Sequence, residues 1–205
     1  MKRGLCPTSA VASCIIVLLL SGAAFAGEAR VHDGFFLRLS GGGGGASTEI
    51  EAGSFEAELS GGTGDANIAI GGIVAPNLAL HGTLFGFVLS EPDFEINDIE
   101  GGSANDVDVS VSAIGGGLTY YFMPVNIYLS GSAGAATIEI DGPGIDAETD
   151  TGFMGEITLG KEWWVGNSWG LGVAGAAGYH SIPDGDLDES WSGTSFALRF
   201  TATLN

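Results

Sequence analysis

Basic side chains are scarce in this sequence. The 205 residues carry Lys+Arg 6 against Asp+Glu 25, a formal net charge of −19. Nucleic-acid binding depends on clustered Lys and Arg that neutralise phosphates, so this composition excludes that class of partner. Proline is also rare, at 6 residues, and the 36 glycines follow no G-X-Y repeat, which excludes collagen. A hydrophobic fraction of 45% excludes plain disorder.

The only strong targeting signal lies in residues 1–26. Lys2 and Arg3 precede an apolar stretch that is strongest over residues 15–20, and Ala24-Phe25-Ala26 fits a signal-peptidase site. The stretch is short for a membrane anchor, and it follows Cys14 rather than preceding it, unlike a lipoprotein signal. We therefore predict a signal peptide that is cleaved after Ala26. Both cysteines leave with it, so residues 27–205 hold no disulfide.

No later segment has 18 continuous apolar residues, which excludes a transmembrane helix after the leader. Alternation with period 2, which is typical of strands, is frequent instead. The last segment shows it best, with Phe196, Leu198 and Phe200 on one face and Arg199 and Thr201 on the other. We predict eight strands, at residues 35–40, 66–74, 78–89, 107–122, 125–138, 151–165, 169–181 and 196–204.

The predicted connections alternate in length. Three are short, at residues 75–77, 123–124 and 166–168, and four are long, at residues 46–65, 90–106, 139–150 and 182–191. The long ones or their edges hold 21 of the 25 acidic residues. This pattern predicts an all-β fold: an eight-stranded antiparallel up-and-down transmembrane β-barrel, with short periplasmic turns and four long acidic extracellular loops.

Aromatic residues gather at the ends of the predicted strands, as in the interfacial girdles of membrane barrels. Lys161 shares its strand face with Ile157 and Leu159, which predicts that it reaches lipid phosphates from the lipid side. The predicted membrane-interface aromatics are Tyr120, Phe122, Tyr128, Trp163, Trp164 and Trp169 near the short turns, and Tyr179 and Trp191 near the long loops.

The segments DGFFLRLS at 33–40, GLTYYFMP at 117–124 and GKEWWV at 160–165, together with the alternating last strand, resemble a known family. They are similar to the small eight-stranded outer-membrane barrels of Gram-negative bacteria, of the OmpA, OmpX and OmpW-like type. The resemblance covers residues 27–205 as one domain. It implies a location in the cell outer membrane, and its OmpW-like members imply a narrow channel for small hydrophobic solutes. Such barrels often end on Phe, whereas this chain ends on Asn205.

Eight strands enclose an interior that side chains can fill. Arg38 and Arg199 lie on the first and last strands at similar predicted depth, and they require counter-charges. Glu156 and Glu162 are the inward acids that could supply them, with Glu162 nearer in depth. The predicted salt bridges either fill the lumen or form an ion gate. One strand, 107–122, changes the parity of its apolar residues, which predicts a bulge near residues 115–117 or an extension beyond the membrane.

Motifs for chemistry are weak. Five glycines at 41–45 lack the Gly-Lys-Ser/Thr of a phosphate loop. Residues 184–189 resemble the start of a calcium loop, but Glu189 and Ser195 occupy the positions that require Gly and Glu. His180 and Ser181 are adjacent in a strand, so their side chains point to opposite faces. We therefore predict no catalytic residue, no cofactor and no dedicated metal site.

Four functions stay open at this stage. The first is a structural or surface-interaction barrel with a lumen plugged by side chains and acidic loops as the contact surface. The others are the narrow channel, a lipid-modifying hydrolase, and a soluble lipocalin-like binder. The predicted partners are outer-membrane lipid and lipopolysaccharide, with divalent cations at the acidic loops. The sequence does not identify a protein partner.

Overall fold

The computed structural model describes residues 32–52, 55–97, 99–104, 106–185 and 189–205. The predicted signal peptide lies outside these residues. Strands and turns make up the described part of the chain, and no helix in it is long and apolar enough to cross a membrane.

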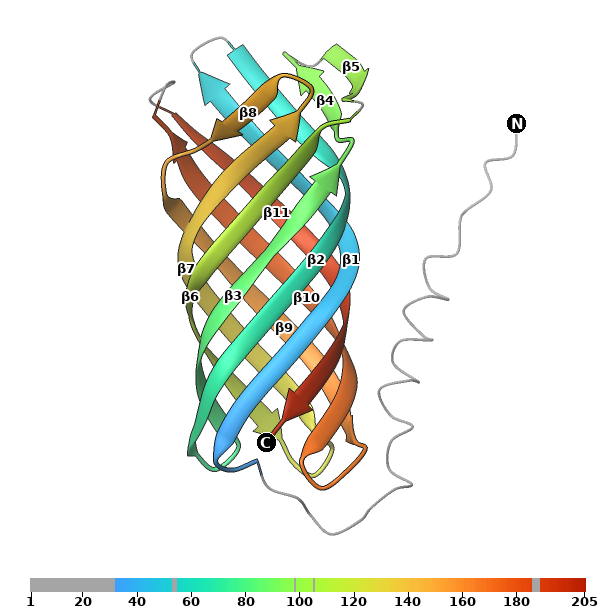
Figure 1. Cartoon of the computed structure of the whole chain (residues 1–205), viewed down its shortest axis with the longest axis vertical. Helices are drawn as coiled ribbons and strands as arrows, with labels where there is room; N and C mark the ends of the chain where they lie inside the picture. The colour runs from blue at the N-terminus through green and yellow to red at the C-terminus, as the bar shows by residue number, and fades with distance from the viewer. Residues whose placement is uncertain (1–31, 53–54, 98, 105, 186–188) are drawn as a thin grey trace, which may run out of the picture.

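Eight long strands form a closed antiparallel barrel, which confirms the predicted fold class (Figure 1). Each strand pairs with its neighbours in the chain, and β1 closes the barrel by pairing with both β2 and β11. The strands are β1 (Phe35–Ala52), β2 (Phe55–Ala75), β3 (Leu78–Ser90), β6 (Asp108–Phe122), β7 (Ile127–Gly142), β9 (Gly152–Trp164), β10 (Trp169–Asp184) and β11 (Glu189–Leu204).

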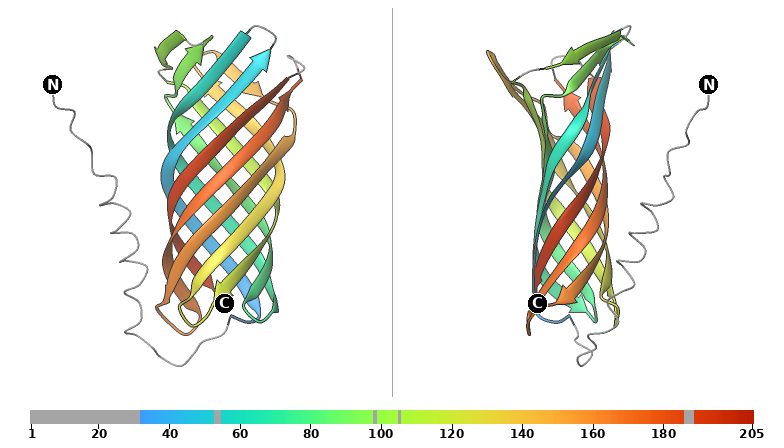
Figure 2. Two further views of the ribbon diagram at one scale, coloured as in Figure 1. Left: turned by 180° about the vertical axis from the view of Figure 1, so that it is seen from behind. Right: turned by 90° about the vertical axis from the view of Figure 1, so that its right-hand side faces the viewer.

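The two ends of the barrel differ (Figure 2). One end, which we call the turn end, carries the short connections after β2, β6 and β9 and the C-terminus. The opposite end, the loop end, carries three short strands: β4 (Asp93–Ile96) and β5 (Ile99–Ser103) form a hairpin beside β2, and β8 (Ile145–Glu148) pairs with β7.

Burial alternates along each strand, as the period-2 pattern predicted. In β3, for example, His81, Thr83 and Phe85 are buried in the lumen, whereas Leu80 and Leu84 are exposed on the outside. Toward the turn end every long strand exposes large apolar side chains, and together they form an outward apolar band. One member from each strand is Leu39, Ile70, Leu84, Leu118, Leu129, Ile157, Leu171 and Phe200.

Strand β6 contains no bulge, because its pairing with β3 and β7 continues without a shift in register. Val109 and Val111 face the lumen, and Leu118 and Tyr120 face outward. The parity of the apolar residues changes because the environment of the two faces changes. Toward the loop end the inside of the wall is apolar, and the outside becomes polar.

The prediction of a long loop at residues 46–65 is wrong. Strand β1 continues to Ala52 and β2 starts at Phe55, so the acidic residues Glu49 and Glu58 lie opposite each other in paired strands. Strands β10 and β11 similarly extend to Asp184 and from Glu189. These extensions form a collar beyond the apolar band. Its outward residues include Ser47, Glu49, Glu58, Ser110, Ser112, Thr137, Glu139, Ser192 and Thr194.

Two facing glycines allow the strongly curved wall to close. Gly115 in β6 and Gly134 in β7 are directly paired and point inward. A Cβ on Gly115 would overlap the carbonyl oxygen of Ala133, and one on Gly134 would overlap that of Ile114. Both overlaps involve backbone atoms, so neither can be relieved by a side-chain rotation.

We expect Gly115→Ala to destabilise the barrel by about 1–3 kcal/mol, the usual cost of overpacking. The matched control is Gly131→Ala in β7, where an added Cβ meets no atom within 4 Å. Thermal unfolding in detergent, followed by heat-modifiable migration on gels, measures both. Equal melting temperatures for the two variants would contradict the steric requirement at Gly115.

Candidate functional site

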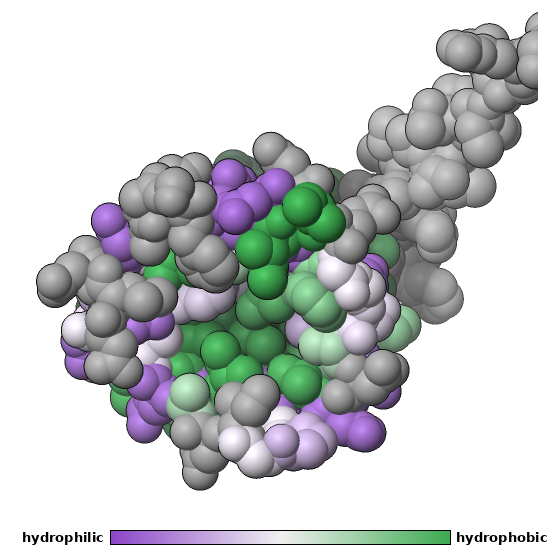
Figure 3. Space-filling view, turned by 90° about the horizontal axis from the view of Figure 1, so that it is seen from above, coloured by the Kyte–Doolittle hydropathy of each residue, from purple (hydrophilic) through white to green (hydrophobic). Residues whose placement is uncertain are grey.

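The lumen near the loop end is a packed apolar cluster. We call it the upper lumen, and its buried residues are Ala46, Phe85, Phe87, Leu89, Val109, Val111, Ala113, Ala136, Ile138, Met154 and Ile182. Viewed from the loop end, apolar side chains fill the middle of the barrel, and polar ones lie around its rim (Figure 3). Leu89 and Ile182 are 0% exposed, so neighbouring side chains cover them completely.

Below this cluster, one arginine joins three strands across the lumen. Arg199 in β11 forms ion pairs with Asp65 in β2 and Glu156 in β9. Its Nη1 lies 2.7 Å from Glu156 Oε1, and its Nη2 lies 2.8 Å from Asp65 Oδ2. Asn67 and Thr158 also donate hydrogen bonds to Glu156, at 3.3 Å and 3.1 Å. The network joins β2, β9 and β11 across the lumen, and each of its three charged side chains has a partner of opposite charge.

Asp65 lies in β2 and not in a loop, so the predicted set of inward acids did not include it. Inward and outward positions alternate along β2, and Asp65 has the same parity as the inward residues Asn67 and Ala69. This alternation could have predicted that Asp65 faces the lumen. Of the two acids predicted as counter-charges, Glu156 forms an ion pair with Arg199, whereas Glu162, which was expected to be nearer in depth, accepts a hydrogen bond from Thr203 instead. Arg38 lies opposite Thr203, whereas Arg199 lies opposite Gly42, so the two arginines sit at different depths.

Arg38 and Glu162 find other partners nearer the turn end. Arg38 Nη2 donates to Ser130 Oγ at 3.0 Å, and its guanidinium lies 4.5 Å from the centre of the Tyr128 ring. Glu162 accepts a hydrogen bond of 2.6 Å from Thr203 Oγ1. Hydroxyls and an aromatic face therefore replace the predicted salt bridge. Strand tilt explains why the predicted depths of these side chains were wrong. In a staggered barrel, residues at equal distances from their strand ends do not lie at the same depth along the barrel axis.

His32 is buried at the turn end of the barrel. Its ring stacks on Tyr121, with ring centroids 3.6 Å apart, and its Nε2 lies 2.7 Å from Asn126 Oδ1. The Trp164 ring is 5.0 Å away on another side. Burial lowers the pKa of His32 below its usual value, so the imidazole is held neutral in this contact.

The predicted interface aromatics divide into two groups, apart from Trp163, which is half-buried beside Lys161. Tyr120, Phe122, Trp169 and Tyr179 point outward and are 40–50% exposed at the two edges of the apolar band; their contact with headgroups stays a prediction. Three others are corrections: Tyr128 is buried in the lumen, Trp164 contacts His32, and Trp191 packs on the upper lumen. Each has the inward parity of its strand.

Lys161 and Trp163 lie together near the turn end. Lys161 Nζ donates to the carbonyl oxygen of Val125 at 2.6 Å and lies 5.4 Å from the centre of the Trp163 ring. The side chain is 4% exposed, so the prediction that it reaches lipid phosphates is wrong. A backbone acceptor in the neighbouring turn binds the ammonium instead.

His180 and Ser181 do not form a hydrolytic pair. His180 is buried in the lumen, where its Nε2 lies 2.9 Å from Thr48 Oγ1, and Ser181 lies on the opposite face of β10. Among the described residues, no three His, Cys, Asp or Glu side chains are grouped in a way that could hold a metal ion.

Opposed carboxylates mark the outside of the collar. Glu49 in β1 lies directly opposite Glu58 in β2, and Asp108 in β6 lies directly opposite Asp141 in β7. Like charges opposite each other destabilise a sheet in the absence of screening. The collar therefore has an electrostatic cost that ions in solution can offset.

Comparison with known proteins supports the architecture. No protein-family model matches the chain, and no curated protein matches it in sequence. The crystal structure of Neisserial surface protein A aligns with a TM-score of 0.53 at 12% identity, covering 83% of this chain and 96% of that one. The fold is that of the small outer-membrane β-barrels.

Two further solved structures align over most of the barrel at lower TM-scores. The outer-membrane protein AlkL aligns at 0.48, with 16% identity over 87% of this chain and 93% of that one. OprG from Pseudomonas aeruginosa aligns at 0.45, with 12% identity over 85% of this chain and 98% of that one.

The ion pairs of Arg199 generate a stability prediction. We expect Arg199→Leu to lower the free energy of unfolding by about 3–5 kcal/mol, because it leaves Asp65 and Glu156 buried without their partner. Adding D65N and E156Q to this variant should recover most of the loss, since neutral amides need no counter-charge. Thermal unfolding in detergent measures all three forms. An unchanged melting temperature with raised conductance would instead favour an ion gate.

His32 predicts a pH dependence. Its pKa is lowered in the folded barrel from an unfolded value of about 6.5, so the unfolded chain binds more protons at low pH. The contribution of His32 is therefore fully present above about pH 6.5 and is lost as the pH falls below it. His32→Phe keeps a ring against Tyr121 but cannot titrate. We expect its melting temperature to fall less than that of the wild type between about pH 7.5 and about pH 5.5; equal slopes would contradict the prediction.

Proposed function

We propose that the protein is an integral outer-membrane barrel with a closed lumen, and that its collar and loop end form an interaction surface outside the cell. The observation that carries this proposal is the reversal of polarity along the wall. On β10 the outward apolar positions run from Trp169 to Tyr179, a length that suits one tilted crossing of a bilayer. Beyond Tyr179 the outward face becomes polar at Ser181.

The apolar band also separates this proposal from a soluble lipocalin-like binder. A soluble barrel would bury its large apolar side chains, whereas Phe196, Leu198 and Phe200 are 65–78% exposed here. Short turns at one end and longer connections at the other give the orientation, with the turn end in the periplasm.

Three layers of side chains support a closed lumen: the upper lumen, the Arg199 network, and the residues around His32. The narrow channel for small hydrophobic solutes is the second candidate, and the apolar upper lumen is the observation that favours it. Passage would require the packed side chains of that layer to separate. It would also require the ion pairs of Arg199 to open, so the static arrangement favours the closed form.

The collar provides the surface for interactions in this proposal. Its opposed carboxylates, such as Glu49 with Glu58, favour divalent cations over an acidic or neutral partner. Cations held there could also bridge the collar to the anionic groups of lipopolysaccharide. A hydrolytic role gains no support from the positions of His180 and Ser181.

Cell fractionation and bilayer recording test the first part of the proposal. We expect the protein in the outer-membrane fraction, with heat-modifiable migration, and we expect no single-channel conductance in planar bilayers. Arg199→Leu serves as a control that weakens one layer of the plug. Recovery of the wild-type protein in the periplasmic fluid would contradict the membrane location, and steady conductance would favour the channel.

Divalent cations test the collar. We expect Mg²⁺ to raise the melting temperature more than Na⁺ at equal ionic strength, because it offsets the repulsion between Glu49 and Glu58. A gain of about 1 kcal/mol corresponds to about 2–4 °C for a chain of this size. The variant Glu58→Gln removes the opposed charge and should reduce the Mg²⁺ response. The same response in both proteins would contradict a role for this pair.

A further inference from the structure

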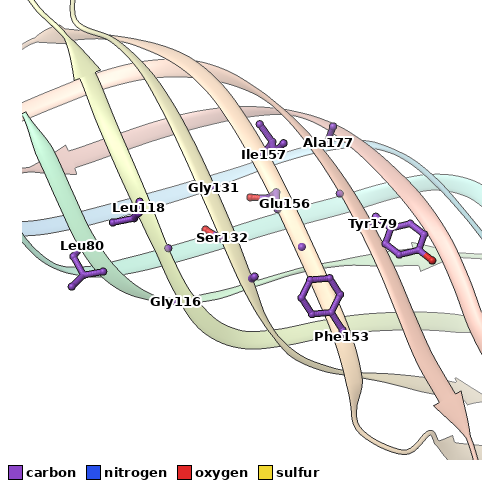
Figure 4. Close-up of a pocket in the computed structure, with 14 residues that line it drawn as sticks. Leu80, Gly116, Leu118, Gly131, Ser132, Phe153, Glu156, Ile157, Ala177 and Tyr179 are labelled. Atoms are coloured by element: carbon purple, nitrogen blue, oxygen red, sulfur yellow. The ribbon is translucent and has the colours of Figure 1, made fainter.

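A groove of about 880 Å³ crosses the outside of the barrel over β6, β7, β9 and β10 (Figure 4). Its floor consists of small residues, which include Gly116, Gly131, Ala133, Gly155 and Ala177. Large side chains border it: Leu80 and Leu118 on one side, and Phe153 and Tyr179 at the other. Two other outward grooves are about half as large, at about 410 and 420 Å³.

One row of paired residues runs along the groove across the sheet. Tyr179 lies opposite Gly155, Gly155 opposite Ala133, Ala133 opposite Gly116, and Gly116 opposite Gly82. Neighbouring strands are about 4.8 Å apart, so the small residues from Gly155 to Gly82 extend over about 14 Å. Because the strands tilt, the row runs diagonally, from near the loop end of β9 toward the turn end of β3.

The architecture of the wall does not require these glycines. A Cβ on Gly131 would meet no atom within 4 Å, and the nearest atom to one on Gly116 is His81 O at 3.5 Å. By contrast, Gly115 and Gly134 on the inward face are fixed by backbone overlap. Glycine in a strand costs stability relative to a residue with a side chain. The open floor therefore calls for an explanation other than the closure of the barrel.

We propose that this groove binds one acyl chain of a lipid from the extracellular leaflet. The inference rests on the membrane location proposed above, because it continues the lipid-facing surface of the apolar band. Only apolar and small residues form its outward lining. Glu156 lies behind the floor and is bound by Arg199. Tyr179 stands at the loop-end entrance, where an amphipathic ring suits the headgroup zone of the outer leaflet.

The shape of the groove favours a single chain over a second barrel. Its floor lies in two neighbouring rows of paired residues, because Gly131 and Ala177 belong to the row next to Gly116 and Gly155, and its borders protrude, with Ile157 64% exposed and Leu118 50% exposed. A second barrel is convex and would rest on these borders without reaching the floor. A stable protein interface also buries about 800 Å² on each partner, which a narrow groove does not provide.

Native mass spectrometry of the whole protein, purified from nanodiscs of dipalmitoyl phosphatidylethanolamine, tests the proposal. As the nanodisc is stripped from the protein in the mass spectrometer, we expect the wild type to retain one lipid. The double variant Gly116→Leu with Gly131→Phe fills the groove and should retain that lipid at least tenfold less. The matched control, Gly175→Phe, places the same ring on another outward site where a Cβ meets no atom within 4 Å; it should retain the lipid as the wild type does.

Heat-modifiable migration of each variant shows that it has folded and inserted. Equal lipid retention by the filled variant and the wild type would overturn the inference, as would an inserted wild type that retains no lipid. A dimer that the filled variant abolishes would also overturn it and assign the groove to a second copy. Failure of the wild type to insert into membranes would overturn the proposed function itself, which separates the two failures.

Discussion

Closure of the sheet by the pairing of β1 with β11 is the constraint on which the rest of the structure depends. It satisfies the backbone hydrogen bonds of both strands, which a wall within a bilayer requires. It also fixes the number of strands at eight, and hence the small radius of the lumen. The facing glycines Gly115 and Gly134 then become necessary, because the curved wall leaves no space for a Cβ at their positions.

In a narrow closed barrel each strand has an inward and an outward face that require side chains of different polarity. The polarity that each face requires changes along the barrel axis. In the apolar band the outward face is apolar, and the lumen holds polar groups that bind one another. In the collar the outward face contacts water, and the lumen can be apolar. The parity change in β6, from Val109 and Val111 inward to Leu118 and Tyr120 outward, follows from this change of environment without any irregularity in the backbone.

The period-2 pattern was sufficient to predict the eight strands and the closed barrel, because alternation is a local property of the chain. It failed where the outward face became polar: Glu49 and Glu58 suggested a loop, although both lie in paired strands. Glu156 was a candidate partner of Arg199 from its inward position, but Asp65, and the choice of Glu156 over Glu162, could not be predicted from strand positions alone. These partners depend on the stagger between strands. The stagger brings Asp65 and Glu156 to the level of Arg199, whereas Glu162 accepts a hydrogen bond from Thr203.

The closed lumen that we propose also determines where recognition can occur. The side chains in each layer of the interior contact one another. Apolar side chains pack together in the upper lumen, two carboxylates pair with Arg199, and His32 stacks on Tyr121. Contacts with other molecules must then use the outer surface of the wall. That surface offers opposed carboxylates on the collar and a groove in the apolar band. In the proposed function, the collar binds cations in water and the groove binds an acyl chain in the membrane, so the two surfaces would act on the same lipid layer from different depths.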